Sequence, residues 1–188
     1  MKTKIKDIAT VRTGIFAKPK TKGDIIYLQS SYFGSDGLLK QYVHPDLPLD
    51  SNIRKHLLTP GEVLFSAKGS RNLAIVFLNE YHPSVASSSF LILSPDFAKV
   101  MPEYICWYLN TPEIQMQLKK EALGTSIQSI SKAVLEELYI PIPSLVKQQK
   151  IIELHELSVK AKSLKTEIST LESKVIEHHI FNLINSIT

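Results

Sequence analysis

Two short basic segments of this chain carry the residue types that bind nucleic acid. Lys18, Lys20 and Lys22 alternate with proline and small residues, which is the composition of an exposed loop, and lysines on a loop suit contact with phosphate. The second segment, residues 68–72 (KGSRN), is typical of a tight turn between two strands. Its Arg and Asn can form bidentate hydrogen bonds with base edges in a major groove. Solubility alone would also explain the first segment, and strand-turn-strand structure the second.

Positive charge is concentrated in the same part of the chain. Residues 1–72 contain twelve Lys and Arg against six Asp and Glu, a net charge of +6, whereas residues 73–188 contain ten against twelve, a net charge of −2. This distribution favours a DNA- or RNA-binding face. A chance asymmetry on a solvated surface is the alternative.

No motif for catalysis or metal binding accompanies these segments. The glycine-rich phosphate-binding patterns G-x-x-x-x-G-K and G-x-G-x-x-G do not occur. The prolines do not form the Asn/Asp-Pro-Pro-aromatic site of a base methyltransferase, and Glu177-His178-His179 lacks metalloprotease spacing. We therefore expect no catalytic residue and no metal site here, with any reaction carried out by another chain. A single cysteine, the absence of a long apolar run and an N-terminus without a signal-peptide core predict a cytoplasmic protein without a membrane span.

The patterning of residues 1–143 predicts an α+β domain. We expect a helix over 4–11, strands near 25–29, 63–66, 73–78 and 85–93, a short helix capped by Ser51, and two helices that begin near Pro102 and Glu113. Residues 30–37 form a polar loop in which Tyr32 and Phe33 are expected to be exposed or half-exposed. A short helix and an apolar strand, 138–142, complete the domain.

Pro141 and Pro143 end that strand, and from Ser144 the pattern is helical almost to Thr188. We therefore predict a target-binding domain over 1–143 and a spacer or dimerisation helix over 144–188. About 40 helical residues would span about 60 Å, which is too long for one side of a small core.

This helix carries a heptad seam, with apolar residues spaced alternately by three and four. The predicted interface positions are Leu154, Leu157, Ala161, Leu164, Ile168, Leu171 and Val175, with His178 at the next d position. Parallel pairing would set Lys160 against Lys165 and Glu167 against Glu172, whereas antiparallel pairing allows Lys165 with Glu172 and Glu167 with Lys174. We predict an antiparallel coiled coil, formed with another copy or a related helix. A single amphipathic helix folded back on its own domain is the alternative.

Several of these features together resemble the specificity subunit of type I restriction-modification systems. The resemblance rests first on residues 58–66 (LTPGEVLFS), in which Gly61-Glu62 precedes an apolar strand, and on Gly69 shortly after it. It rests further on Gly124-Thr125, followed by Pro141-Ile142-Pro143 and by Gln148 and Gln149 at the start of a long helix. It covers essentially the whole chain. Such subunits usually hold two target-recognition domains and two spacer helices, and this chain shows one of each, which suggests a half-length form.

The resemblance implies a non-catalytic DNA-recognition subunit. It would direct methyltransferase (M) and restriction (R) subunits to a bipartite target in double-stranded DNA, pairing as a homodimer or with another half-subunit. S-adenosylmethionine, ATP and Mg²⁺ would be bound by the partner subunits, and no cofactor by this chain. A non-catalytic scaffold, or an idle truncated or recombination-donor copy, is the alternative.

The resemblance does not indicate which residues contact DNA, so we predict them from their chemistry. The expected phosphate contacts are Lys18, Lys20, Lys22, Lys68 and Arg71, and the expected base contacts are Tyr32, Ser70, Asn72 and Gln128.

Overall fold

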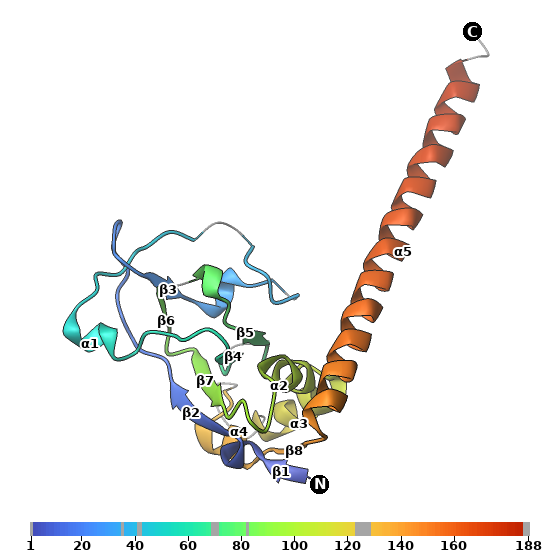
Figure 1. The fold of residues 1–188 in the computed structure, drawn as a ribbon. Helices are drawn as coiled ribbons and strands as arrows, with labels where there is room; N and C mark the ends of the chain where they lie inside the picture. The colour runs from blue at the N-terminus through green and yellow to red at the C-terminus, as the bar shows by residue number, and fades with distance from the viewer. Residues whose placement is uncertain are drawn as a thin grey trace. The chain divides into compact units, whose positions relative to one another are not determined.

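The structure is a computed structural model, and it describes residues 2–34, 36–40, 43–68, 72–81, 83–122 and 129–185. The chain divides into two compact units, Met1–Gln148 (unit 1) and Gln149–Thr188 (unit 2). The α+β class expected for the chain is confirmed: unit 1 combines three small sheets with short helices, and a long C-terminal helix supplies unit 2 (Figure 1).

A four-stranded antiparallel sheet forms the centre of unit 1, in the order β2-β7-β4-β5. Its strands are β2 (Ala9–Thr13), β7 (Phe90–Pro95), β4 (Val63–Ser66) and β5 (Ala74–Val76). All four residues of β4 are buried, and so are five of the six in β7. These strands are therefore covered on both faces, which explains their continuous apolar sequence.

Two smaller sheets lie at opposite ends of unit 1 (Figure 1). At one end β3 (Ile26–Leu28) pairs in parallel with β6 (Ser84–Ala86). At the other end β1 (Lys2–Lys4) pairs antiparallel with β8 (Tyr139–Pro141). The remaining elements of unit 1 are η1 (Ile5–Asp7), η2 (Ser30–Tyr32), α1 (Ser51–Arg54), η3 (Asn79–Tyr81), α2 (Pro102–Leu109), α3 (Pro112–Ala122) and α4 (Lys132–Glu137).

Glu62 is the centre of a buried polar network in unit 1. Its carboxylate accepts hydrogen bonds from the Arg12 guanidinium at 2.9 and 3.1 Å, from the Thr59 backbone N–H at 2.9 Å and from the Ser94 hydroxyl at 2.6 Å. The network joins β2, β7 and the turn before β4, so a nearly fully buried carboxylate is well compensated. Gly61 precedes it with φ +90°, where a Cβ would lie 3.0 Å from the Phe97 ring. Both facts explain the Gly-acidic pair in this turn.

Helix α5 (Leu145–Asn185) begins directly after the two prolines, and Gln148 holds its first turn in unit 1. The fully buried side-chain amide donates to the carbonyl oxygens of Lys99 (3.0 Å) and Pro143 (2.9 Å) and accepts from the Met101 N–H at 2.9 Å. Because these partners directly precede α2 and α5, Gln148 links the first turn of α5 to the start of α2 by hydrogen bonds.

Four local predictions were wrong. Residues 4–11, predicted as a helix, form the end of β1, η1 and the start of β2. The apolar residues spaced by three suggested a helix, but pairing of β2 with β7 overrides this local preference. The predicted strand 85–93 is split into β6 and β7 by a turn that follows Ser87. Asp50, one residue before Ser51, caps α1 through Asn52 and Ile53 N–H. Phe33 is buried, edge-on to Phe90.

The described part of unit 2 is one uninterrupted helix, which ends at Asn185. From Glu153 to Asn185 every residue of α5 is exposed, including all seven predicted seam positions. No helix in the described part of the chain is long and apolar enough to cross a membrane.

Candidate nucleic-acid interface

A hollow of about 370 Å³ lies in unit 1 between η2, β4 and β5. Phe33, Leu73, Ile75 and Phe90 form part of its wall, and its polar groups come from Ser30, Ser31, Lys40, Ser66 and Lys68. Two lysines and three hydroxyls around an apolar floor suit a ligand that carries both negative charge and a flat apolar face. Phosphate next to an unstacked or edge-on base has that character.

The segment after β3 is shaped by Lys40. Its ammonium group donates to the Ser31 carbonyl at 2.9 Å, and its backbone N–H donates to the Tyr32 carbonyl at 2.9 Å. The Tyr32 hydroxyl accepts from the Gln29 amide at 3.2 Å, which leaves the half-buried ring beside the hollow rather than within its lining. Lys40 thus joins the end of this segment to Ser31 and places a positive charge in the lining of the hollow.

Lys68 also lines the hollow, and it follows shortly after the end of β4. Its side chain is exposed, and its backbone forms an antiparallel bridge with Ser129, while Ile130 N–H donates to the Ala67 carbonyl at 2.8 Å. The chain on either side of residues 69–71 and the chain after residue 128 therefore meet at this point, although about 60 residues separate them in sequence.

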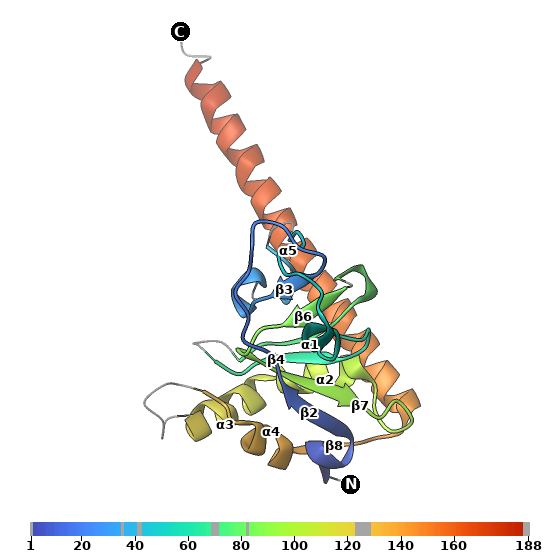
Figure 2. The same ribbon diagram turned by 90° about the vertical axis from the view of Figure 1, so that its left-hand side faces the viewer.

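Lys18, Lys20 and Lys22 are exposed on the loop between β2 and β3, which runs at the β3·β6 end of unit 1 (Figures 1 and 2). We call residues 16–24 the lysine loop. Lys20 N–H donates to the Asp46 carbonyl at 2.6 Å and Asp24 N–H to the Leu47 carbonyl at 2.9 Å. Within the described residues, no ion pair involves the three lysines. Their charge is therefore available to an anionic ligand on a tethered loop.

The predicted contacts fall into three groups. Lys68 and Tyr32 lie at or beside the hollow, and the three loop lysines lie at the same end of unit 1 as β3. Asn72 is buried, with its amide donating to the Ser66 carbonyl at 3.1 Å, so this side chain is committed to the fold and does not face a ligand. Ser70, Arg71 and Gln128 lie outside the described residues.

Two residues of this surface were missed in the sequence. Lys40 lies in the wall of the hollow, and Phe16 is 80% exposed at the start of the lysine loop. A bulky aromatic side chain beside three lysines was a visible signal for Phe16. No such signal marked Lys40, because it lies next to Ser31 only through the hydrogen bonds that the folded loop forms.

The described part of the chain shows neither a metal-binding cluster nor an ionised thiol. Among the described residues, no group of three or more His, Cys, Asp or Glu side chains is placed to hold a metal ion. The thiol of Cys106 lies in α2, and burial raises its pKa to about 12, so it remains protonated near neutral pH.

Comparison with known proteins decides the family. The model of the type I restriction modification DNA specificity domain matches residues 1–173. This chain belongs to that family. Members of the family recognise a DNA target, which agrees with the basic surface of unit 1. A comparison with curated protein sequences finds no match.

Solved structures support the same fold. The chain is similar to the HsdS subunit from Thermoanaerobacter tengcongensis, with 17% identity and a TM-score of 0.62 over 88% of this chain and 38% of that one. It is also similar to the type I restriction-modification S subunit from M. genitalium, with 18% identity and a TM-score of 0.58 over 88% and 40% of the two chains. A further match belongs to a structure concerned with assembly and conformational transition of the type I system, with 18% identity, a TM-score of 0.64 and coverage of 93% and 42%. The chain thus spans about two fifths of the length of these three proteins.

Proposed function

We propose that this chain reads one half of a bipartite target in double-stranded DNA and directs methyltransferase and restriction subunits to it. The family match over residues 1–173 carries the proposal. The lysine loop and the hollow supply the chemistry that it needs, since exposed cations hold the phosphate backbone while groups on the hollow contact bases. In this assignment residues 1–143 are the target-recognition domain, and residues 144–188 are the spacer helix.

The proposal includes pairing of the spacer helix with that of a second copy or of a different half-subunit. Its support is the row of exposed apolar residues along α5, which water solvates poorly. Two recognition domains related by a two-fold axis would read two symmetric half-sites, and the helix length would set the unread gap between them.

The reactions belong to the partner subunits in this proposal. Base methylation would use S-adenosylmethionine on the methyltransferase subunit, and cleavage would use ATP and Mg²⁺ on the restriction subunit. This chain would contribute recognition and spacing, acting on DNA in the cytoplasm.

The test is methylation in cells. The chain is expressed together with a type I methyltransferase subunit from the same genome in a host that lacks the system, and methylated positions are mapped by sequencing. We expect methylation within one interrupted sequence, and its loss when Lys18, Lys20 and Lys22 are all replaced by glutamine. A folded chain that yields no methylated motif and does not bind duplex DNA in the presence of heparin would favour a scaffold or an idle copy.

A further inference from the structure

The lysine loop begins with Phe16, which at 80% exposed is the most exposed large apolar side chain in the described part of the chain. Of the other phenylalanines in unit 1, Phe33, Phe65, Phe77 and Phe90 are buried. A single exposed apolar residue is common on protein surfaces, so exposure by itself assigns no role. Phe16 is distinguished by the way its backbone is held and by the charge beside it.

The backbone on both sides of Phe16 is fixed by hydrogen bonds. The Ile15 N–H donates to the Ala86 carbonyl at 2.9 Å. The Tyr27 hydroxyl donates to the Ile15 carbonyl at 3.0 Å and accepts from the Ala17 N–H at 3.3 Å, so one hydroxyl group bridges the two neighbours of Phe16. Because Tyr27 is itself buried, the ring of Phe16 projects from an anchored segment rather than from a free loop.

The side chains around Phe16 alternate between the interior and the solvent. Ile15 and Ala17 pack against a buried apolar cluster that includes residues of β3 and β6. Phe16 and Lys18 are exposed. Pro19 favours an extended backbone at Lys18, and in an extended chain successive side chains point to opposite faces. Phe16 and Lys18 therefore share the outer face, about 7 Å apart along the chain.

The charges of the lysine loop suit a polyanion. The loop contains three lysines and one acidic residue, a net charge of +2. That acidic residue, Asp24, uses its carboxylate to accept the Leu49 N–H at 2.9 Å. Asp46, whose carbonyl accepts the Lys20 N–H, uses its carboxylate to accept the Tyr27 N–H at 2.8 Å. Both carboxylates serve the fold, so the lysines keep their charge for a ligand.

Duplex DNA matches the combination of an anchored ring and exposed lysines. Its phosphates supply anions to the lysines, and its bases present flat apolar faces wherever a base step is opened. Proteins that bend DNA insert apolar side chains, phenylalanine among them, between neighbouring base pairs. A ring that already projects from a fixed backbone needs no rearrangement to enter such a step.

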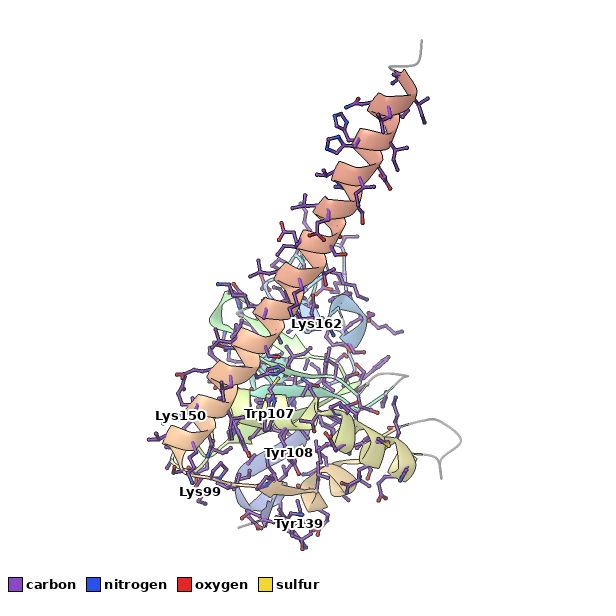
Figure 3. The ribbon with its side chains drawn as sticks, turned by 90° about the vertical axis from the view of Figure 1, so that its right-hand side faces the viewer. Lys99, Trp107, Tyr108, Tyr139, Lys150 and Lys162 are labelled. Carbon is purple, nitrogen blue, oxygen red and sulfur yellow. The ribbon has the colours of Figure 1, made fainter. Side chains whose placement is uncertain are left out.

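The other exposed aromatic rings in the described part of unit 1 have different surroundings. Phe97 is 60% exposed and lies against the turn at Gly61. Tyr139 is 52% exposed at the β1·β8 end of unit 1, below Tyr108 in Figure 3. The Lys4 ammonium group lies 5.6 Å from the centre of the Tyr139 ring. In sequence, neither ring adjoins a group of lysines as Phe16 does.

We infer that Phe16 inserts its ring between two base pairs of the bound half-site while Lys18, Lys20 and Lys22 hold the neighbouring phosphates. The inference rests on the proposed function and adds a residue that senses how easily the DNA is deformed. Base steps differ in the cost of opening, and pyrimidine–purine steps open most easily. A ring held at a fixed place in the complex would therefore favour a flexible step at its position and would kink the DNA there. Phe16 would thus contribute to specificity without a hydrogen bond to a base.

Fluorescence of 2-aminopurine tests the insertion. The duplexes carry the motif found by methylation mapping, each with 2-aminopurine at one position, and its fluorescence rises when the neighbouring base is unstacked. With the full wild-type chain we expect a rise at one base step, and Phe16→Ala should abolish it. No rise with the wild-type chain, or an equal rise with both chains, overturns the inference.

Phe97→Ala is the matched control, because it removes the same ring from another exposed position. β2 and β7 are antiparallel, and Phe16 and Phe97 each follow the C-terminal end of one of them, so the two rings belong to opposite ends of the pair. Fluorescence anisotropy should show that Phe16→Ala weakens binding to the motif about tenfold, while Phe97→Ala leaves it unchanged. The slope of log K against log salt concentration should stay the same, since a phenyl ring carries no charge. Equal losses of affinity in the two variants overturn the inference.

The proposed function and this inference fail differently. A wild-type chain that gives no methylated motif and does not bind duplex DNA in the presence of heparin overturns both. If the motif is methylated and Phe16→Ala binds it as tightly as the wild type, the proposed function stands and only the insertion is overturned. Loss of methylation in cells with unchanged DNA binding would assign Phe16 to a contact with the methyltransferase subunit instead.

Discussion

In unit 1 the large apolar side chains are buried, whereas along α5 they are exposed. Phe65, Phe77 and Phe90 are fully buried in unit 1, while Leu154, Leu157 and Leu164 are between 49% and 67% exposed on α5. Among the described residues, every buried side-chain nitrogen or oxygen has a hydrogen-bond partner. Unit 1 thus satisfies its own buried polar groups, whereas α5 leaves a row of apolar side chains exposed. In the proposed pairing, the first set of residues makes the fold and the second makes the assembly.

The seam should show the largest effect. In a paired helix, Leu164→Ala should cost about 2–5 kcal/mol per copy, hence about 4–10 kcal/mol per dimer, because it leaves a gap in the buried seam. Sedimentation equilibrium measures the change, and Val159→Ala, off the seam, serves as the control. An unchanged dissociation constant for Leu164→Ala would show that the seam is not buried.

Unit 1 should respond next most strongly, at Glu62. Glu62→Ala leaves the partly buried Arg12 guanidinium and the Thr59 N–H without their acceptor, at a cost of about 3 kcal/mol in the free energy of unfolding. Glu62→Gln keeps an acceptor oxygen and should cost roughly half as much. Urea unfolding of the full chain, followed through Trp107 in unit 1, measures both. Similar values for the two variants would mean that the neutral acceptor oxygen of glutamine recovers nothing, so that the charge of Glu62 carries the whole effect.

The lysine loop should affect DNA binding without affecting stability. Replacing Lys18, Lys20 and Lys22 with glutamine should reduce the slope of log K against log salt concentration by about 2.7 if each lysine neutralises one phosphate. The loss should be similar for every duplex sequence, since phosphate contacts carry no sequence information. Replacing Lys119, Lys120 and Lys132 removes the same charge from α3 and α4, and a matching change of slope there would locate the interface elsewhere.

The smallest effect concerns an exposed cluster in unit 1. Hydrogen bonds from Lys4 and Lys6 lower the pKa of Glu137 from 4.5 to about 2. The charged carboxylate therefore stabilises the fold above about pH 4.5, and this contribution is lost as the pH falls towards 2. Glu137→Gln should flatten the thermal stability profile over this interval, most visibly at low salt. A profile parallel to that of the wild type would show that the three side chains act independently.

Local patterns predicted much of unit 1 because several of its elements are locally encoded. Pro102 at the start of α2 and the run Val63–Ser66 are recognised from neighbouring residues alone. The opening segment was misread because the partner of β2 is β7, some 80 residues further along the chain. The candidate interface was partly predicted, since exposed lysines on a loop are visible in composition. Burial of Asn72 and the contact of Lys40 with Ser31 are not visible in composition, because both depend on pairing between residues apart in the chain.

The order of residues was enough to separate a mixed domain with a basic first part from a helix with a heptad seam, and to mark the junction between them by two prolines. These are properties of composition and periodicity, which act over a few turns or strands. Which polar side chains serve the fold and which face outwards is known only from the three-dimensional arrangement, because burial is set by residues far apart in the chain.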